Sequence, residues 1–324
     1  MDFERFKKTQ KKVLKLIENS YHKNRLVHAY LFEGAKGTPK IEAAYYLASL
    51  LLCTGDNKPC LECLECQRVL KKEHPRIYYV EASGENIRKD QIDDLIFEFS
   101  RKGLEDGTRV YIIKDIEKAT LPAANSLLKF IEETKEGIYG VMITENLSNV
   151  LSTIISRSQV VSFSKVSEEE IISEYEKNGI DNETSRVLST ITNDTNEGLE
   201  LYNEGKILNL IEMVKICNKE ILNEGNPYLA FYENYKRLFE DLNDKKYHQI
   251  FMDLLITITN DRIYKILGQE DRIVFINEAS FFDATSDYHR TFRQVDTMAR
   301  FKGRLKYNVN LETMYMQMFI EVMK

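Results

Sequence analysis

The sequence predicts an α/β domain built on a parallel sheet, followed by a small helical domain and a longer all-helical domain. In the first half, short apolar runs alternate with helical patterns, which is typical of parallel strands with helices on both faces of the sheet. After residue 163, helical patterns separated by Asn and Gly replace the apolar runs. The chain of 324 residues is long enough for these domains, which we expect at 1–163, 164–206 and 207–324.

Composition indicates a globular protein without a membrane part. The net charge of -6 argues against a protein that wraps nucleic acid by itself, although it leaves room for a local basic patch. The first ten residues, MDFERFKKTQ, are too charged for a secretion signal, and no apolar run approaches the ~18 residues of a membrane span. We therefore expect a cytoplasmic protein.

The first element is expected to be one helix over Phe3–Ser20, because apolar residues recur there at helical spacing. Its lysines indicate a solvated helix face, with contact to nucleic acid as the alternative; they are Lys7, Lys8, Lys11, Lys12 and Lys15.

The next elements are a buried strand over Ala29–Phe32, a glycine loop, and a helix over Glu42–Leu52. This layout is that of a phosphate-binding P-loop, G-x-x-x-x-G-K-[ST]. Gly34, Gly37 and Lys40 fit the pattern. Pro39 stands where the second required glycine should be, and Ile41 where the hydroxyl should be. The loop is therefore a degenerate form of a nucleotide site.

The remaining elements follow the same logic. Further strands are expected at Ile77–Val80, Arg109–Ile113, Tyr139–Thr144 and Gln159–Phe163, with helices over Ile87–Phe99 and from Pro122 onward. In the second half, Ser167 and Glu170 form the pattern of a helix-capping box, a strand pattern returns only at Ile273–Ile276, and the last helix covers Leu311–Val322.

Cysteine usage indicates a metal site. Cys53, Cys60, Cys63 and Cys66 supply four thiols within one short segment, and in a reducing compartment such a cluster favours metal binding over disulfides. Four thiolates at this spacing are typical of a closed, structural zinc site, although an iron–sulfur cluster uses the same ligands. Cys217 stands alone and is expected in the core.

Several motifs, taken in order, resemble bacterial clamp-loader subunits, the AAA+ proteins of the DNA polymerase III holoenzyme. They are HAYLFEGAKGTPK, the cysteine cluster, RVYIIKD, LPAANSLLKFIEE and ISRS, and they cover Phe3 to about Phe163. The resemblance implies an AAA+ domain, a helical lid and a helical collar that joins subunits into a hetero-oligomer. It also implies zinc as the metal of the cysteine cluster. Within the family, the degenerate loop points to the delta-prime type and away from the ATP-hydrolysing gamma/tau type.

The resemblance also implies that ATP hydrolysis is lost. Pro39 removes an N–H group from the phosphate cradle, and Ile41 cannot ligate Mg²⁺. Lys114 and Asp115 stand where the family has a magnesium-binding Asp and a catalytic Glu, and Leu201 aligns with a phosphate-sensing Arg. Weak residual nucleotide binding is left open.

Two further residues match functional positions of the family. Arg157, in Ser156-Arg157-Ser158, matches an arginine that projects into the ATP site of a neighbouring subunit, and the alternative is a surface arginine before an edge strand. Ser158 departs from the family's cysteine at that position. Thr144 matches the sensor that faces the γ-phosphate in active relatives.

Together these features predict a non-hydrolysing clamp-loader subunit. Its expected partners are the gamma/tau and delta subunits and, through the assembled complex, the sliding clamp and primed DNA. The alternatives are an active ATPase of the gamma/tau type and a P-loop phosphotransferase. Pro39, Ile41 and Lys114 argue against both.

Overall fold

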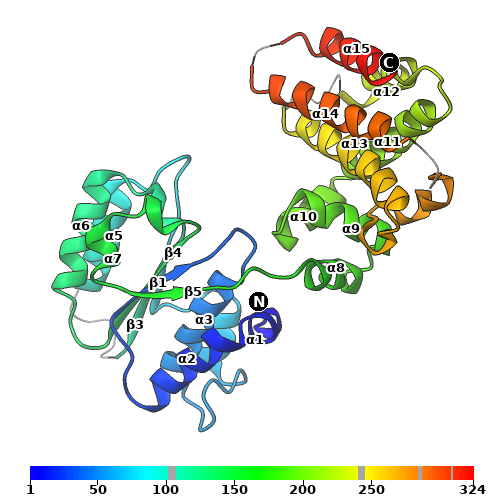
Figure 1. Ribbon diagram of the computed structural model, residues 1–324. Coiled ribbons are helices and arrows are strands. Elements are labelled where there is room, and N and C mark those ends of the chain that lie inside the picture. Colours follow the sequence, from blue (N-terminus) through cyan, green and yellow to red (C-terminus); the bar gives the residue numbers. More distant parts are fainter. Residues whose placement is uncertain (101–106, 240–244, 284–286, 308) are drawn as a thin grey trace. The chain divides into compact units, whose positions relative to one another are not determined.

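The structure is a computed structural model that describes residues 1–100, 107–239, 245–283, 287–307 and 309–324. The chain divides into two compact units, Met1–Val166 and Ser167–Lys324, which are described separately (Figure 1). The predicted finer boundary at residue 206 stays a prediction. Among the described helices, none combines the length and apolar character needed to cross a membrane.

The first unit is organised by a five-stranded sheet of order β2-β3-β4-β1-β5, in which all pairs are parallel. The strands are β1 (Ala29–Glu33), β2 (Ile77–Val80), β3 (Arg109–Ile113), β4 (Ile138–Thr144) and β5 (Gln159–Ser162). The predicted parallel α/β architecture is confirmed, and each predicted strand lies within a residue or so of its expected limits. Parallel strands carry their carboxyl ends at one edge, so the glycine loop after β1 lies beside the ends of β4 and β5.

Helices cover both faces of this sheet (Figure 1). They are α1 (Glu4–Thr9), α2 (Lys11–His22), α3 (Lys40–Leu52), α4 (Leu64–Leu70), α5 (Lys89–Ser100), α6 (Leu121–Glu132) and α7 (Ser152–Ile155), with short 3-10 turns η1 (Ile116–Lys118) and η2 (Leu147–Asn149). Successive side chains of β1 point to opposite faces. Tyr30 and Phe32 join the core under α1 to α4, and Leu31 joins the core under α5 to α7.

The predicted single helix over Phe3–Ser20 is wrong, because the chain breaks at Gln10 into α1 and α2. The Gln10 side chain is buried, donates to the carbonyl of Ser164 at 2.8 Å and accepts from the Ser164 N–H at 3.0 Å. This amide pairs with backbone groups that follow β5, and the break brings it there. A pairing across 154 residues leaves no periodic signal in the sequence.

The second unit is helical in the described residues. Its helices are α8 (Glu168–Lys177), α9 (Asn182–Ile191), α10 (Thr195–Asn203), α11 (Lys206–Leu222), α12 (Pro227–Phe239), α13 (Lys245–Ile266), α14 (Tyr288–Arg304) and α15 (Leu311–Val322), with 3-10 turns η3 (Glu270–Arg272) and η4 (Ile276–Phe281). The predicted capping box is confirmed, since Ser167 and Glu170 exchange side-chain and backbone hydrogen bonds. The predicted last helix is confirmed over Leu311–Val322.

The predicted strand at Ile273–Ile276 is wrong. The N–H groups of Val274 and Phe275 donate to the carboxylate of Asp261, at 3.1 and 2.8 Å, where a strand would use a neighbouring strand. Asp261 is fully buried on α13, and burial raises its pKa to about 6. A short apolar run in a helical core therefore needs no neighbouring strand when a buried carboxylate accepts hydrogen bonds from its backbone N–H groups.

Candidate functional site

The lysine of the degenerate loop is buried and turned back onto the loop itself. The ammonium of Lys40, the first residue of α3, lies 2.5 Å from the carbonyl oxygen of Gly34, 2.9 Å from that of Ala35 and 3.0 Å from Thr38 Oγ1. These three acceptors use the three N–H donors of a lysine ammonium. In a working P-loop the same ammonium contacts the β- and γ-phosphates.

The backbone donors of the loop are also used within the loop. The N–H of Thr38 donates to Ala35 at 3.2 Å, and the N–H of Lys40 donates to Thr38 at 2.7 Å. Pro39, between them, has no N–H and caps α3 with φ of -76°. A phosphate cradle needs successive N–H groups converging on one point. Thr38, Pro39 and Lys40 therefore present no free backbone N–H group to a ligand.

A residue outside the motif holds the loop from the other side. Arg5, on α1, donates from Nη2 to the carbonyl oxygen of Gly37 at 2.5 Å, and its Nη1 lies 3.9 Å from a carboxylate oxygen of Glu42 on α3. The arginine thus joins the N-terminal helix to the loop and to the helix that follows it. The sequence carries no pattern that singles out Arg5.

The surroundings of Lys40 are acidic. Burial lowers the pKa of the Lys40 ammonium, and nearby carboxylates oppose this shift; they are Glu145, Asp115, Glu117 and Glu33. Asp115 pairs with Lys118 at 2.9 Å, and Lys114 Nζ lies 3.8 Å from Glu81. The edge of the sheet beside Lys40 therefore carries several negative charges. Such a field disfavours a polyanion.

Two other predicted nucleotide-sensing positions are buried. Thr144, at the end of β4, is fully buried; its hydroxyl accepts from the N–H of Asn146 at 3.1 Å and donates to the carbonyl of the same residue at 3.2 Å. Leu201 is buried on α10.

Cys217 is buried on α11 as expected, and burial raises the pKa of its thiol.

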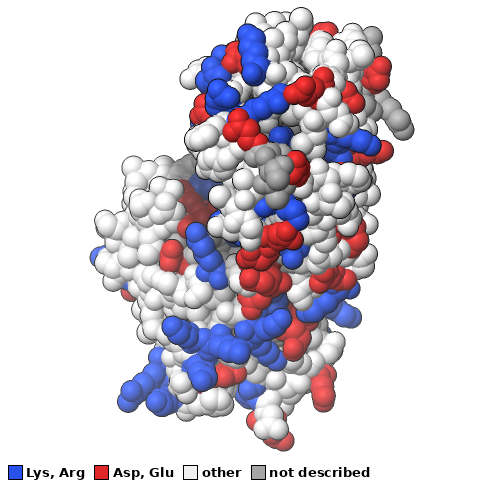
Figure 2. All heavy atoms as spheres, turned by 45° about the vertical axis from the view of Figure 1, so that its right-hand side comes forward, with Lys and Arg blue, Asp and Glu red and all other residues white. Residues whose placement is uncertain are grey.

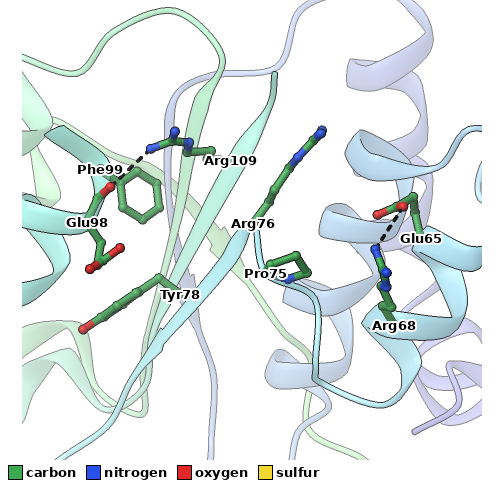
Figure 3. Close-up of a pocket in the computed structure, with 8 residues that line it drawn as sticks. All are labelled: Glu65, Arg68, Pro75, Arg76, Tyr78, Glu98, Phe99 and Arg109. Carbon is green, nitrogen blue, oxygen red and sulfur yellow. Dashed lines mark hydrogen bonds and ion pairs between the residues drawn. The ribbon is translucent and has the colours of Figure 1, made fainter. Parts of the chain in front are cut away.

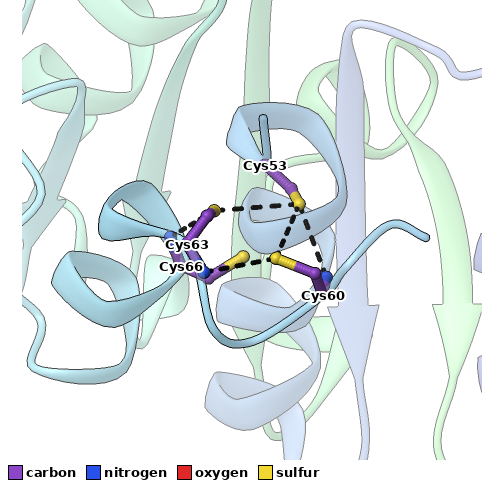
Figure 4. A group of neighbouring side chains, drawn as sticks. All are labelled: Cys53, Cys60, Cys63 and Cys66. Atoms are coloured by element: carbon purple, nitrogen blue, oxygen red, sulfur yellow. Dashed lines mark hydrogen bonds between the residues drawn. The ribbon is translucent and has the colours of Figure 1, made fainter. Parts of the chain in front are cut away.

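The four clustered cysteines are brought together as predicted. Their sulfur atoms all lie within 4.8 Å of one another and turn toward a common centre (Figure 4). Cys53 Sγ lies 3.5 Å from the sulfur of Cys60 and 3.9 Å from that of Cys63. Tetrahedral zinc with Zn–S bonds of ~2.3 Å places its sulfur ligands roughly 3.8 Å apart. The four residues therefore fit a metal ion.

Backbone N–H groups donate to the sulfurs of Cys53, Cys60 and Cys63, whereas burial raises the pKa of the Cys66 thiol. Cys53 Sγ accepts from the N–H of Gly55 at 3.3 Å and of Cys60 at 3.4 Å, and Cys60 Sγ accepts from Cys63 at 3.3 Å. Burial raises the pKa of the Cys63 thiol, but backbone hydrogen bonds, including that from Cys66, outweigh burial and lower it to about 5. Hydrogen bonds to a charged form stabilise that form. Gly55 is required, because a Cβ there would lie 2.9 Å from the sulfur of Cys60.

Arg157 lies between α7 and β5, where the sequence analysis placed it, and its side chain is partly exposed. Its Nε donates to the carboxylate of Glu132, the last residue of α6. Its Nη1 donates to the carbonyl of Thr153 and to Ser156 Oγ, each at 3.3 Å. Ser158, which departs from the family's cysteine, donates its hydroxyl to the carbonyl of Ile154 at 2.8 Å. The contact with Glu132 was not foreseen, since the two residues lie 25 positions apart.

The described residues also form a cavity that no sequence pattern indicated. It measures about 200 Å³ and lies near the amino-terminal ends of β2 and β3, the edge opposite to Lys40 (Figure 3). Its lining residues are Glu65, Arg68, Pro75, Arg76, Tyr78, Glu98, Phe99 and Arg109. Arg68 lies 3.4 Å from the carboxylate of Glu65, and Arg109 donates to the carbonyl of Glu98 at 3.2 Å. Two of its arginines are thus engaged within the wall.

Charge is mixed over the face shown in Figure 2, where Lys and Arg side chains are interspersed with Asp and Glu, apart from a local gathering of basic side chains near the bottom of the view. This pattern agrees with the net charge of -6.

Comparison with known proteins finds relatives among the subunits of DNA polymerase III. A family model described as DNA polymerase III, delta subunit, matches residues 9–167. The chain is 32% identical over 308 residues to the delta′ subunit of DNA polymerase III from Bacillus subtilis, covering 94% of this chain and 93% of that subunit. It is 29% identical over 185 residues to the delta′ subunit from Haemophilus influenzae, covering 56% of each. It is also 28% identical over 170 residues to the tau subunit from Bacillus subtilis, covering 52% of this chain and 30% of that subunit.

Proposed function

The chain belongs to the delta′ family of DNA polymerase III clamp-loader subunits, and from this premise we propose that it takes part in clamp loading without hydrolysing ATP itself. The observation that carries this proposal is the closed loop. Lys40 binds the carbonyls of its own loop, and Pro39 removes a backbone donor at the position that should face the phosphate. The protein is then a structural member of the DNA polymerase III nucleotidyltransferase complex and has no ATPase activity of its own.

The chemistry of the surrounding edge supports the same proposal. ATP hydrolysis needs a carboxylate and a hydroxyl that hold Mg²⁺, and a group that orients the attacking water. Lys114 places a cation after β3, near Glu81, and Ile41 offers no hydroxyl. The remaining carboxylates near Lys40 would repel the triphosphate in the absence of a bound metal.

We propose that Arg157 acts on the ATP of a neighbouring subunit. A cation placed in trans neutralises charge that develops on the transferring phosphoryl group, which is worth about 10³–10⁵ in rate. The partly exposed guanidinium at the end of α7 supports this role. Replacing Arg157 with alanine should lower the ATPase rate of the assembled complex and leave assembly intact.

We propose that the four cysteines hold one structural Zn²⁺. Cys53, Cys60, Cys63 and Cys66 would fill all four positions of a tetrahedral ion, leaving none for substrate. The metal would fix the segment between α3 and α4, which carries little apolar surface of its own. The zinc would therefore contribute folding energy and take no part in catalysis.

The proposed partners follow from the family. The chain would assemble with the gamma/tau and delta subunits and act on the sliding clamp and primed DNA through that complex, in the cytoplasm. Residues 164–206 would form the lid and 207–324 the collar that joins the subunits. The proposal is tested by measuring ATP binding and hydrolysis by the chain alone and by the complex that contains it. Tight binding with hydrolysis by the chain alone would favour an active ATPase of the gamma/tau type.

A further inference from the structure

Glu132 and Arg157 form an ion pair that links the end of α6 to the segment before β5. We propose that Glu132 is a positioning residue, which orients the Arg157 guanidinium toward the ATP of the neighbouring subunit. The inference rests on the proposed role of Arg157 in trans. It adds a second residue to that role, one that touches neither the nucleotide nor the metal.

The hydrogen bonds of Arg157 leave one part of the guanidinium available. Arginine has five N–H donors in a fixed plane. The Nε donor is taken by Glu132, and Nη1 donates to Thr153 and Ser156. Among the residues that the structure describes, none accepts a hydrogen bond from Nη2. Contacts within the subunit thus engage Nε and Nη1, and the two donors of Nη2 remain for an oxyanion of another chain.

The backbone beneath the arginine is fixed as well. The N–H of Arg157 donates to the carbonyl of Ile154 at 3.2 Å, and the N–H of Ser158 donates to Ile155 at 3.2 Å. On the other side of the pair, Ile131 is buried in the core under α6, directly before Glu132. Both ends of the ion pair are therefore attached to rigid parts of the first unit, as a precise contact requires.

Stability does not explain the pair. The two side chains are 41% and 45% exposed, and exposed ion pairs contribute little to folding. Glu132 is also the last residue of α6, and a negative charge at the carboxyl end of a helix is unfavourable. A carboxylate in this position is better explained by what it does to Arg157. It restricts a side chain that otherwise samples many rotamers, so that less ordering remains when the phosphate arrives.

The hydrogen bonds of this ion pair also predict whether removing Glu132 raises or lowers the ATPase rate. Glu132 engages Nε, and Nη2 has no acceptor among the described residues, so Nη2 can donate to a phosphate oxygen while the contact between Nε and Glu132 persists. Removing Glu132 should therefore slow the reaction that Arg157 promotes. A misplaced catalytic group can lose much of its effect through a shift of about 1 Å.

The test uses the clamp loader assembled with its own ATPase subunits and stimulated by primed DNA. The Arg157-dependent rate is defined as the part of the ATPase rate that Arg157→Ala removes. We expect Glu132→Ala to lower this part about tenfold through kcat, with KM for ATP unchanged. Glu132→Asp should restore part of the loss, Glu133→Ala should have no effect, and Glu132→Ala should add nothing in the Arg157→Ala background.

The outcomes separate the two proposals. If Arg157→Ala lowers the rate while Glu132→Ala leaves it unchanged or raises it, the positioning role of Glu132 is wrong and the arginine finger stands. If Arg157→Ala itself has no effect, the finger is wrong. If Glu132→Ala lowers the rate equally with and without Arg157, its effect is not exerted through the arginine, and the positioning proposal is again wrong.

Discussion

The ammonium of Lys40 lies 2.5 Å from the carbonyl oxygen of Gly34, the first residue of its own loop. A lysine that would contact phosphate in a working P-loop instead donates to main-chain oxygens of its own loop, so nucleotide binding would require the loop to reopen. The loop keeps the strand-to-helix geometry of a nucleotide site. The proposed role of this chain in ATP hydrolysis depends instead on Arg157, which would act on the ATP of a neighbouring subunit.

Lys40→Met should lower stability and spare activity. The change leaves three acceptors without their buried donor, so we expect the free energy of unfolding to fall by about 1–3 kcal/mol. The ATPase rate of the assembled complex should stay within about twofold, because this lysine contacts no nucleotide phosphate. Denaturant unfolding and steady-state hydrolysis measure the two effects, with the exposed Lys12→Met as control. A large loss of complex activity with unchanged stability would mean that Lys40 serves a phosphate.

Cys63→Ser should abolish metal binding. Metal analysis should find about one zinc per chain in the unaltered protein and almost none in this variant, whose free energy of unfolding should fall by at least about 3 kcal/mol. Cys217→Ser, which alters a thiol outside the cluster, should keep the full zinc content. Iron with visible absorbance in the unaltered protein would contradict the zinc assignment.

Arg157→Ala should reduce ATP hydrolysis by the complex without dissociating it. ATP hydrolysis at the site that Arg157 faces should slow by about 10³-fold or more. The total ATPase rate of the complex should then fall by the fraction that this site contributes. Size-exclusion chromatography checks that assembly is intact, and the exposed Arg88→Ala is the control. An unchanged rate would make Arg157 an ordinary surface arginine.

Asp261 should make part of the stability of the second unit depend on pH. Burial raises its pKa from 3.8 to about 6, so the folded chain binds this proton more tightly than the unfolded chain. Protonated Asp261 then favours folding, and this contribution of about 3 kcal/mol is present below pH 4 and lost as pH rises to about 6. Unfolding measured from pH 4 to 7 should show this loss in the unaltered chain and lack it in Asp261→Asn. Parallel curves would contradict the raised pKa.

Local patterns predicted the sheet and the metal ligands. Buried parallel strands such as Val110–Ile113 read as continuous apolar runs, and the spacing from Cys53 to Cys66 brings four thiols together within one loop. Both signals are complete within a short segment.

The features that the sequence did not reveal depend on residues far apart in the chain. Gln10 breaks a helical pattern because its amide pairs with Ser164, and Asp261 prevents a strand because it binds the backbone of Val274 and Phe275. The contacts of Arg5 with the loop and of Glu132 with Arg157 belong to the same kind. Each is a polar contact between residues that only folding brings together. Secondary-structure propensity and hydrophobic periodicity in the sequence therefore do not reveal it.

The central claim is that this chain does not use its own loop to bind ATP. The direct test is a titration of the isolated chain with a fluorescent ATP analogue in the presence of Mg²⁺, followed by measurement of phosphate release. We predict no saturable binding below about 1 mM nucleotide and no hydrolysis above background. Micromolar binding together with phosphate release would contradict the claim.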